Sequence, residues 1–283
     1  MKATLSLLFV LASLCCALPA RAMDPCPQLR TQLASTDVAT RIAAIACQEN
    51  HAWFRPFIDA DGRAGGQTVY EAENDALADG AQAWRKVAAY WNGSGLGSGC
   101  GTAAGAACRN FVVDTPWSAA FVSWVMRQAR VPGFAVSSRH VDYVRAAARP
   151  GSGPYRLVAP QAAAPAPGDM LCYVRGQSRA LGHSGLLSVL DGGGAGLPMH
   201  CDIVVATQAG IAWLVGGNVQ QTVALRMLRL DEAGRFADLP MRGAGDMPCS
   251  PDAPVQCNLN RQDWAALLQL RTPDAPSLFA GNP

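Results

Sequence analysis

The sequence predicts an α+β protein, with helices in the first half of the chain and an antiparallel sheet in the second half. Two observations lead to this prediction. Apolar residues recur at helical spacing before residue 150, whereas from Asp169 onward short β-rich segments alternate with glycine and turn residues. The length of 283 residues favours one domain with appended segments over two complete domains.

Residues 1–22 have the pattern of a secretory signal peptide. Lys2 supplies the positive start, Leu5 to Leu18 is an apolar run, and Ala20-Arg21-Ala22 is an A-x-A cleavage site. The apolar run is short for a membrane span, and no later stretch is long enough for one. We therefore expect no membrane span and an exported protein, located in the periplasm or outside the cell.

The charge balance excludes two classes of partner. Of the 23 Lys and Arg residues, Lys2 and Arg21 lie in the expected signal peptide, which holds none of the 21 Asp and Glu residues. The chain that remains after cleavage is formally neutral, with 21 charges of each sign. Nucleic acids and anionic lipids are bound through basic surfaces, so neither is an expected partner.

Eight of the ten cysteines follow the signal peptide, and an even number in an exported chain indicates disulfides. Eight cysteines allow 105 pairings. Pairing of nearest neighbours is the simplest expectation: Cys26 with Cys47, Cys100 with Cys108, Cys172 with Cys201, and Cys249 with Cys257. No C-x-x-C motif is present, which argues against zinc ribbons and thioredoxin chemistry, and we expect neither a metal nor another cofactor.

Residues 23–110 are expected to form a helical N-terminal extension. Helical spacing runs from Cys26 to Glu49, and Thr68 with Glu71 forms a capping box that would open a helix ending near Trp91. A further helix is expected in "DTPWSAAFVSWVMRQA", with Asp114 or Thr115 as its N-cap, and a shorter one in "SSRHVDYVRAAAR", capped by Ser137 or Ser138.

Residues 111–230 form the expected core, and residues 231–283 form a loop-rich C-terminal extension packed on it. The expected strands are 169–174, 200–207, 210–218 and 223–230. The C-terminal extension is expected to contain one helix, over residues 260–271.

Four motifs in residues 111–230 carry a family resemblance. They are "PWSAAFVSWV" at 116–125, "PGDMLCY" at 167–173, "MHCDIVV" at 199–205 and "VGGNV" at 215–219. In this order they resemble the papain-like amidases and peptidases of the NlpC-like and CHAP type. The chain looks most like an uncharacterised exported bacterial family placed beside the NlpC-like enzymes. The resemblance implies a papain-like core, and its main departure is Ser118 in the place of the nucleophilic cysteine.

The resemblance also implies roles for the residues in these motifs. Ser118 would be the nucleophile, His200 the base, and Asn218 or Asp202 the group that orients the base. Because a helix dipole cannot ionise a serine hydroxyl, Ser118 needs a neutral histidine to accept its proton. Each residue also has a structural interpretation: Ser118 as part of a helix start, His200 as a polar residue at a strand start, and Asn218 as a turn residue.

Three further residues are expected to bind substrate beside the nucleophile: Trp117, His140 and Asp114. Trp117 precedes Ser118 and is positioned to form a wall of the cleft, while its helical spacing is also typical of a core residue. His140 is expected on a helix face near the cleft, where a packing histidine is the alternative.

The leading hypothesis is an exported hydrolase that acts on amide or ester bonds through Ser118, His200 and Asn218 or Asp202. The resemblance implies peptide or amide bonds of the cell wall as substrate and peptidoglycan fragments as partners. The alternative is a catalytically inactive papain-like domain that binds cell-wall fragments or a partner protein in the envelope. A third hypothesis, a structural envelope protein, predicts no buried contact between a serine and a histidine. The oligomeric state is left open.

Overall fold

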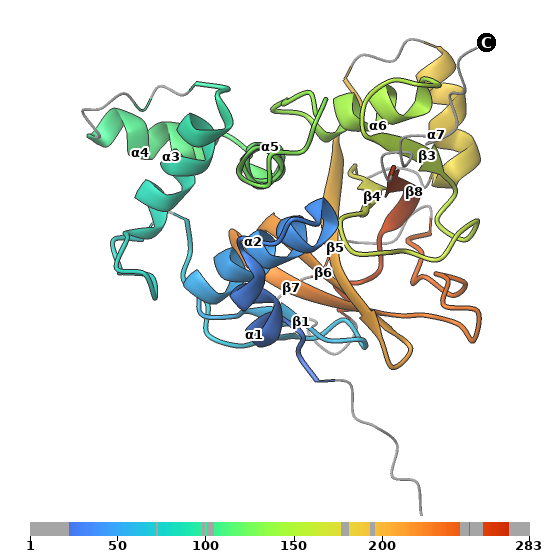
Figure 1. Ribbon diagram of the computed structural model, residues 1–283. Helices are drawn as coiled ribbons and strands as arrows, with labels where there is room; N and C mark the ends of the chain where they lie inside the picture. The colour runs from blue at the N-terminus through green and yellow to red at the C-terminus, as the bar shows by residue number, and fades with distance from the viewer. Residues whose placement is uncertain are drawn as a thin grey trace, which may run out of the picture.

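A computed structural model describes the chain in residues 23–71, 73–97, 100, 105–176, 181–192, 196–243, 249 and 257–271. The expected signal peptide, residues 1–22, lies outside the described residues. In the described part the fold is α+β, as predicted, with helices packed on an eight-stranded mixed sheet (Figure 1).

The strand order in the sheet is β2-β1-β7-β6-β5-β4-β8-β3. The strands are β1 (Phe57–Ile58), β2 (Ala64–Gly65), β3 (Tyr155–Val158), β4 (Met170–Val174), β5 (Met199–Gln208), β6 (Ile211–Val219), β7 (Thr222–Arg229) and β8 (Asp263–Leu270). Neighbouring strands are antiparallel throughout, except that β1 joins β7 in parallel. The four expected strands are confirmed as β4 to β7, each within one residue at both ends.

The helices of the described residues are α1 (Cys26–Leu29), α2 (Val38–Ala52), α3 (Ala83–Ser94), α4 (Ala106–Asp114), α5 (Ser118–Gln128), α6 (His140–Ala148) and α7 (Gly182–Asp191), with a 3₁₀ turn at Arg30–Gln32. Helices α2 and α5 pack on β5 and β6, α3 packs on α5, and α6 and α7 lie toward β3 and β8 (Figure 1). Gly217 of β6 lies so close to α5 that a Cβ there would meet the ring of Phe121.

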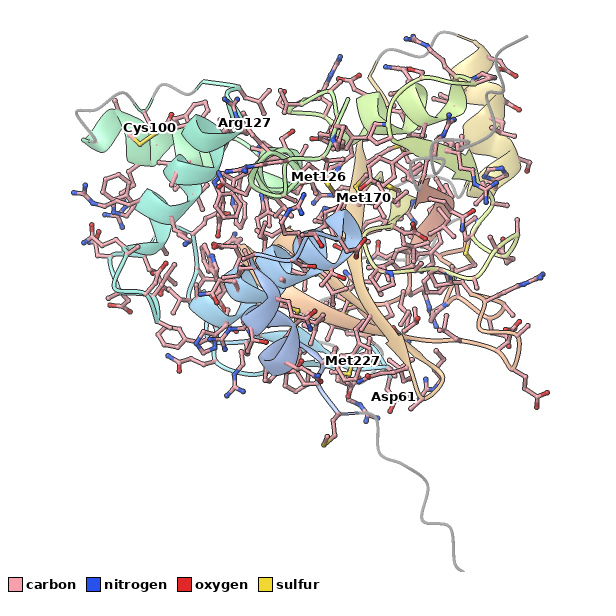
Figure 2. The ribbon with its side chains drawn as sticks, in the orientation of Figure 1. Asp61, Cys100, Met126, Arg127, Met170 and Met227 are labelled. Atoms are coloured by element: carbon pink, nitrogen blue, oxygen red, sulfur yellow. A yellow bond between two sulfur atoms is a disulfide. The ribbon has the colours of Figure 1, made fainter. Side chains whose placement is uncertain are left out.

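The main apolar core fills the space between these helices and the sheet, and Figure 2 shows Met126 and Met170 within it. A second, smaller cluster contains Phe236 and Leu239 of the C-terminal region together with Trp264 of β8 and Leu214 of β6. Strands β5 and β6 therefore have buried residues on both faces, which explains their long apolar runs.

The expected start of the helix that ends near Trp91, at the Thr68–Glu71 capping box, is wrong. Residues 66–71 and 73–82 are not helical, and α3 runs from Ala83 to Ser94. Tertiary contacts replace the capping box, since the Glu71 main-chain N–H donates to Gln221 O and its carboxylate accepts from Trp117. Gly80, in the left-handed region at φ 82°, forms the tight turn before α3.

The helix expected at residues 260–271 is also wrong, because Asp263–Leu270 forms β8 between β4 and β3. Its sequence, DWAALLQL, is rich in helix-forming residues. Both faces of this central strand are buried, so its apolar residues run almost without interruption. Periodicity alone does not distinguish such a strand from a short buried helix.

The eight cysteines that follow the signal peptide form four disulfides, paired as nearest neighbours, as predicted. The Cys172–Cys201 bridge joins two residues directly opposite each other on β4 and β5. These bridges are consistent with an exported protein. Within the described ranges, no helix has both the length and the apolar character needed to cross a membrane.

Candidate functional site

Ser118 is the first residue of α5, and its position differs from the expected capping scheme. Asp114 ends α4 and is exposed, and Trp117 is the N-cap of α5. Trp117 makes no side-chain cap hydrogen bond. The expected N-cap at Asp114 or Thr115 is therefore wrong. Among the described residues, no side chain accepts a hydrogen bond from the main-chain N–H groups of the first turn of α5, which lie beside Ser118.

The hydroxyl of Ser118 contacts a histidine from α6. Ser118 Oγ lies 2.8 Å from His140 Nε2, and the two residues are only 4% and 3% exposed. Tyr143, one helical turn after His140, donates its hydroxyl to Ala119 O and lies within hydrogen-bond distance of Ser137 O. Tyr143 therefore holds the start of α6 against the start of α5, which fixes the Ser118–His140 contact.

The second ring nitrogen of His140, Nδ1, is buried and has no hydrogen-bond partner among the described residues. Burial, together with nearby His200, lowers the pKa of His140 well below 6.5, against an opposing effect of Asp202. His140 is therefore neutral near pH 7. A neutral ring accepts the Ser118 proton at Nε2 in the tautomer that carries its own proton on Nδ1.

His200 and Asp202 lie two residues apart on β5 and belong to a buried polar row. His200 Nε2 lies 2.8 Å from Asp202 Oδ1, and Arg226 Nε of β7 donates to Asp202 Oδ2 at 2.8 Å. Arg226 Nη1 also donates to Leu259 O and to Asn260 Oδ1. Burial alone would raise the pKa of Asp202, but Arg226 and His200 hold that pKa well below its ordinary value. Asp202 is therefore a buried carboxylate in an ion pair.

Gly216 leaves room for this carboxylate. A Cβ at Gly216 of β6 would overlap Asp202 Oδ1. The space that a side chain of residue 216 would fill is thus occupied by a carboxylate from the adjacent strand. Any larger residue at position 216 would displace Asp202 from His200.

The two histidines connect the Ser118–His140 contact to the buried row. The ring centroids of His140 and His200 lie 5.2 Å apart, with an interplanar angle of 49°. His200 also packs against the ring of Tyr173, with centroids 5.1 Å apart. Ser118, His140, His200 and Asp202, all of them sequence candidates, are thus brought together, but the histidine that contacts Ser118 is His140 and not His200.

Three other candidates have different surroundings. Asn218 adopts a left-handed conformation at φ 56° beside a bulge in β6, and the described residues offer its side chain no hydrogen bond to Ser118 or either histidine. Trp117 is fully buried, so it does not form the wall of an open cleft. Asp114 lies exposed at the end of α4 and makes no described contact with Ser118.

Two residues of this region were not among the candidate site residues. Arg226 stands in the apolar strand "TVALRMLR", and a charge at the centre of a buried strand is the signal that would have indicated a buried ion pair. Glu71 was assigned to a capping box, but it accepts the indole N–H of Trp117 and is only 6% exposed. Burial raises the pKa of Glu71, against the opposing effect of this hydrogen bond.

Trp117 itself is held by aromatic packing as well as by Glu71. Its ring stacks on Trp53 and on Tyr90, with centroid distances of 5.7 Å in both cases. The residue before Ser118 is therefore fixed from several sides. Within the described ranges, no group of three or more His, Cys, Asp or Glu residues is arranged to hold a metal ion.

The depressed pKa of His140 predicts how stability depends on pH. In the unfolded chain a histidine binds a proton as the pH falls through about 6.5, whereas folded His140 resists protonation until a lower pH. Its contribution to stability is therefore lost as the pH falls below about 6.5, by up to about 1.4 kcal/mol per pH unit.

Urea unfolding of the wild type and of His140→Gln at pH 7, 6 and 5 measures this contribution. The wild type should lose stability relative to the variant as the pH falls. Burial raises the pKa of Asp169 to about 6. This shift increases stability as the pH falls, but it does so in both proteins and therefore cancels in the comparison. Parallel curves for the two proteins would show that His140 is not buried as a neutral ring.

Comparison with known protein families matches residues 78–270, more than half of the chain, to a family described as "Uncharacterized protein conserved in bacteria (DUF2272)". The matched range includes Ser118, both histidines, Asp202 and Arg226, whereas Glu71 precedes it. No curated protein and no solved structure matches the chain.

Proposed function

The chain belongs to the DUF2272 family of conserved bacterial proteins, and we propose that it is an exported hydrolase of amide or ester bonds with Ser118 as its nucleophile. The observation that carries the proposal is the 2.8 Å contact between Ser118 Oγ and His140 Nε2 at the uncapped start of α5. A nucleophile within hydrogen-bond reach of a neutral base is the arrangement that serine hydrolases require.

In the proposed reaction, Ser118 Oγ attacks the substrate carbonyl while its proton moves to His140 Nε2. The main-chain N–H groups of the first turn of α5 stabilise the oxyanion. The tetrahedral intermediate then collapses to an acyl-serine, and the leaving amine or alcohol takes the proton from His140. Water then attacks the acyl-serine while one of its protons moves to His140 Nε2. His140 gives this proton to Ser118 Oγ as the bond between the acyl group and Ser118 breaks, which releases the acid product.

His200 and Asp202 have a supporting role in this proposal. Asp202 is ionised, and its negative charge raises the pKa of His140 against the larger effects of burial and His200. It therefore favours the imidazolium that forms during attack. His200 contacts both residues: its ring centroid lies 5.2 Å from that of His140, and its Nε2 lies 2.8 Å from Asp202 Oδ1. This revises the role implied by the sequence motifs, since His140 takes the position of base and His200 becomes a positioning residue.

The papain-like core and the cell-wall substrate are part of the same proposal. They rest on the order of the four sequence motifs, which place Ser118 at a helix start, His200 on a strand and Asn218 on the next strand. Four disulfides are consistent with action outside the cytoplasm. Peptide or amide bonds of the cell wall are the substrate class that we propose on this ground.

A second candidate function is supported by the burial of the site. Ser118 and His140 are nearly inaccessible, and His140 Nδ1 has no acceptor among the described residues, whereas a triad places a carboxylate at that nitrogen. These features favour a catalytically inactive domain that binds cell-wall fragments or a partner protein. The buried contact between serine and histidine argues against the third hypothesis, a purely structural envelope protein.

Covalent labelling distinguishes the two candidates. The oxidised protein is incubated with a fluorophosphonate probe, and the modified peptide is identified by mass spectrometry. We expect the adduct on Ser118 in the wild type, a much slower reaction in His140→Gln, and no adduct in Ser118→Ala. A label on another serine, or labelling of His140→Gln at the wild-type rate, contradicts the proposal. Absence of both labelling and turnover of cell-wall fragments supports the binding domain.

A further inference from the structure

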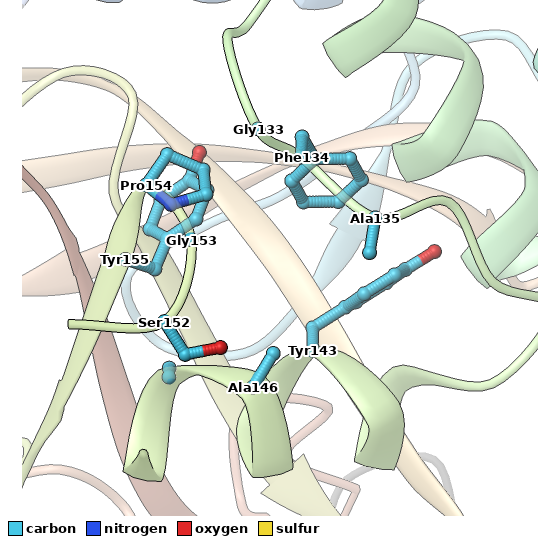
Figure 3. Close-up of a pocket in the computed structure, with 10 residues that line it drawn as sticks. Gly133, Phe134, Ala135, Tyr143, Ala146, Ser152, Gly153, Pro154 and Tyr155 are labelled. Atoms are coloured by element: carbon cyan, nitrogen blue, oxygen red, sulfur yellow. The ribbon is translucent and has the colours of Figure 1, made fainter. Parts of the chain in front are cut away.

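A small pocket lies beside the candidate site, between α6, the loop that precedes α6 and the start of β3. Figure 3 shows it with Phe134 on one side, Tyr143 and Ala146 of α6 on another, and Pro154 and Tyr155 opposite. Its cavity volume is about 80 Å³. Neither Ser118 nor His140 is among the residues that line the pocket.

The lining of the pocket is uncharged, and most of its polar groups are already paired. Tyr143 binds Ala119 O through its hydroxyl, and the Tyr155 hydroxyl donates to Gly168 O at 2.9 Å. The Ser152 hydroxyl has no hydrogen bond among the described residues, and Figure 3 shows it directed inward, toward Ala146. The pocket therefore offers apolar surface and one hydroxyl that is available to a ligand.

Tyr143 joins this pocket to the candidate site. Its ring packs nearly perpendicular to that of His140, with centroids 5.7 Å apart, and its centroid lies 5.1 Å from that of Phe134. Because Tyr143 also binds the main chain of Ala119, next to Ser118, a group seated in the pocket lies one aromatic ring away from His140.

We propose that this pocket binds a short aliphatic side chain, of the size of alanine to valine, from a peptide substrate held at Ser118. A cavity of about 150 Å³ accommodates benzene, so about 80 Å³ suits a group of a few carbon atoms and excludes aromatic side chains. The uncharged lining disfavours a charged group, which would lose its hydration without gaining a partner. The Ser152 hydroxyl is available to the amide group beside such a side chain. The inference rests on the proposed function for the identity of the substrate.

Binding is tested in Ser118→Ala, so that no turnover is needed. N-acetyl-Xaa-N-methylamides with Xaa as Gly, Ala, Val, Phe or Lys are titrated while the methyl signals of Ala146 and Ala147 are followed by NMR. We expect the Ala and Val ligands to shift these signals and the Gly, Phe and Lys ligands to leave them in place. No shift with any ligand, or equal shifts with all of them, overturns the proposal.

A matched pair of variants identifies the pocket itself. Ala146→Leu, added to Ser118→Ala, fills the pocket and should weaken binding of the Val ligand at least tenfold. Ala148→Leu lies on the same helix at an exposed position outside the pocket and should bind like the parent protein. Equal affinity in the two variants overturns the proposal. The labelling of Ser118 decides the proposed function separately, since the NMR titration does not depend on a reactive serine.

Discussion

Replacement of Ser118 by alanine is expected to lower kcat/KM for an ester or cell-wall peptide substrate by about 10⁴-fold or more. The alanine has no group that can form the acyl intermediate, so catalysis falls to the level that binding and the helix N–H groups supply. The measurement is turnover by the purified, disulfide-bonded protein. Ser188→Ala, at an exposed serine of another helix, α7, is the control and should retain most of the activity. Equal activity of wild type and Ser118→Ala would refute the role of Ser118.

The same assay distinguishes the two histidines. His140→Gln removes the group 2.8 Å from Ser118 Oγ and should cause a loss close to that of Ser118→Ala. His200→Gln acts through His140 and should cause a smaller loss, of about 10- to 100-fold. The reverse order would restore His200 as the base, as the sequence motifs imply. In the wild type, kcat/KM should fall only at a pH well below 6.5, because burial and nearby His200 lower the pKa of His140.

The central strands could be predicted from the sequence because their signals are local. Gly210, for example, has a left-handed backbone in the turn between β5 and β6, so turn chemistry and apolar runs together define these strands. Strand β8 was mistaken for a helix because Ala and Leu have high helix propensity, whereas its position between β4 and β3 is decided by tertiary packing. The capping-box signal at Thr68 and Glu71 was overridden by the buried contact between Glu71 and Trp117.

Four of the seven candidate site residues lie together in the structure, but the pairing of Ser118 with His140 was not predicted. Ser118, His140, His200 and Asp202 all come from motifs that can be read locally. Which histidine contacts Ser118 depends on the position of α6, and that position is fixed by the hydroxyl of Tyr143 on the main chain of α5. No local pattern encodes this contact between helices.

The surroundings of Asp202 were also only partly predictable from the sequence. Its spacing from His200 placed the two on one face of a strand, which the 2.8 Å hydrogen bond between them bears out. The absence of a side chain at Gly216, on the neighbouring strand, makes room for the carboxylate of Asp202. A comparison of motifs position by position does not reveal this contact between strands.

Replacement of Arg226 by methionine should lower the free energy of unfolding by about 3–5 kcal/mol. Arg226 is 3% exposed, and it neutralises Asp202, which is fully buried. Methionine fills much of the same volume but leaves the Asp202 carboxylate with His200 as its remaining partner, and it removes the donor to Asn260. The measurement is reversible urea unfolding of the oxidised protein at pH 7.

Arg229→Met is the matched control because Arg229 lies on the same strand and pairs with Asp61, but both of these side chains are more than half exposed. Its loss should change stability little, since water screens such a pair. If Arg226→Met does not fold, Arg226→Lys keeps the charge but cannot reproduce the contacts of the guanidinium, and should show a smaller loss. A loss in Arg226→Met no larger than in Arg229→Met would show that the buried pair does not stabilise the fold.

The pH dependence gives an independent check on the same ion pair. The folded-state pKa of Asp202 lies below its unfolded value of about 3.9, so the stabilisation is present above that pH and is lost as the pH falls below it. Arg226 is the charge that lowers the pKa of Asp202 most, and the variant lacks it. The pKa of Asp202 in folded Arg226→Met is therefore higher than in the wild type, and the difference in stability between the two proteins should narrow as the pH falls through that higher pKa. A difference that stays constant to pH 3 would mean that Arg226 stabilises the fold by packing on Trp264, 5.7 Å away, and not by its charge.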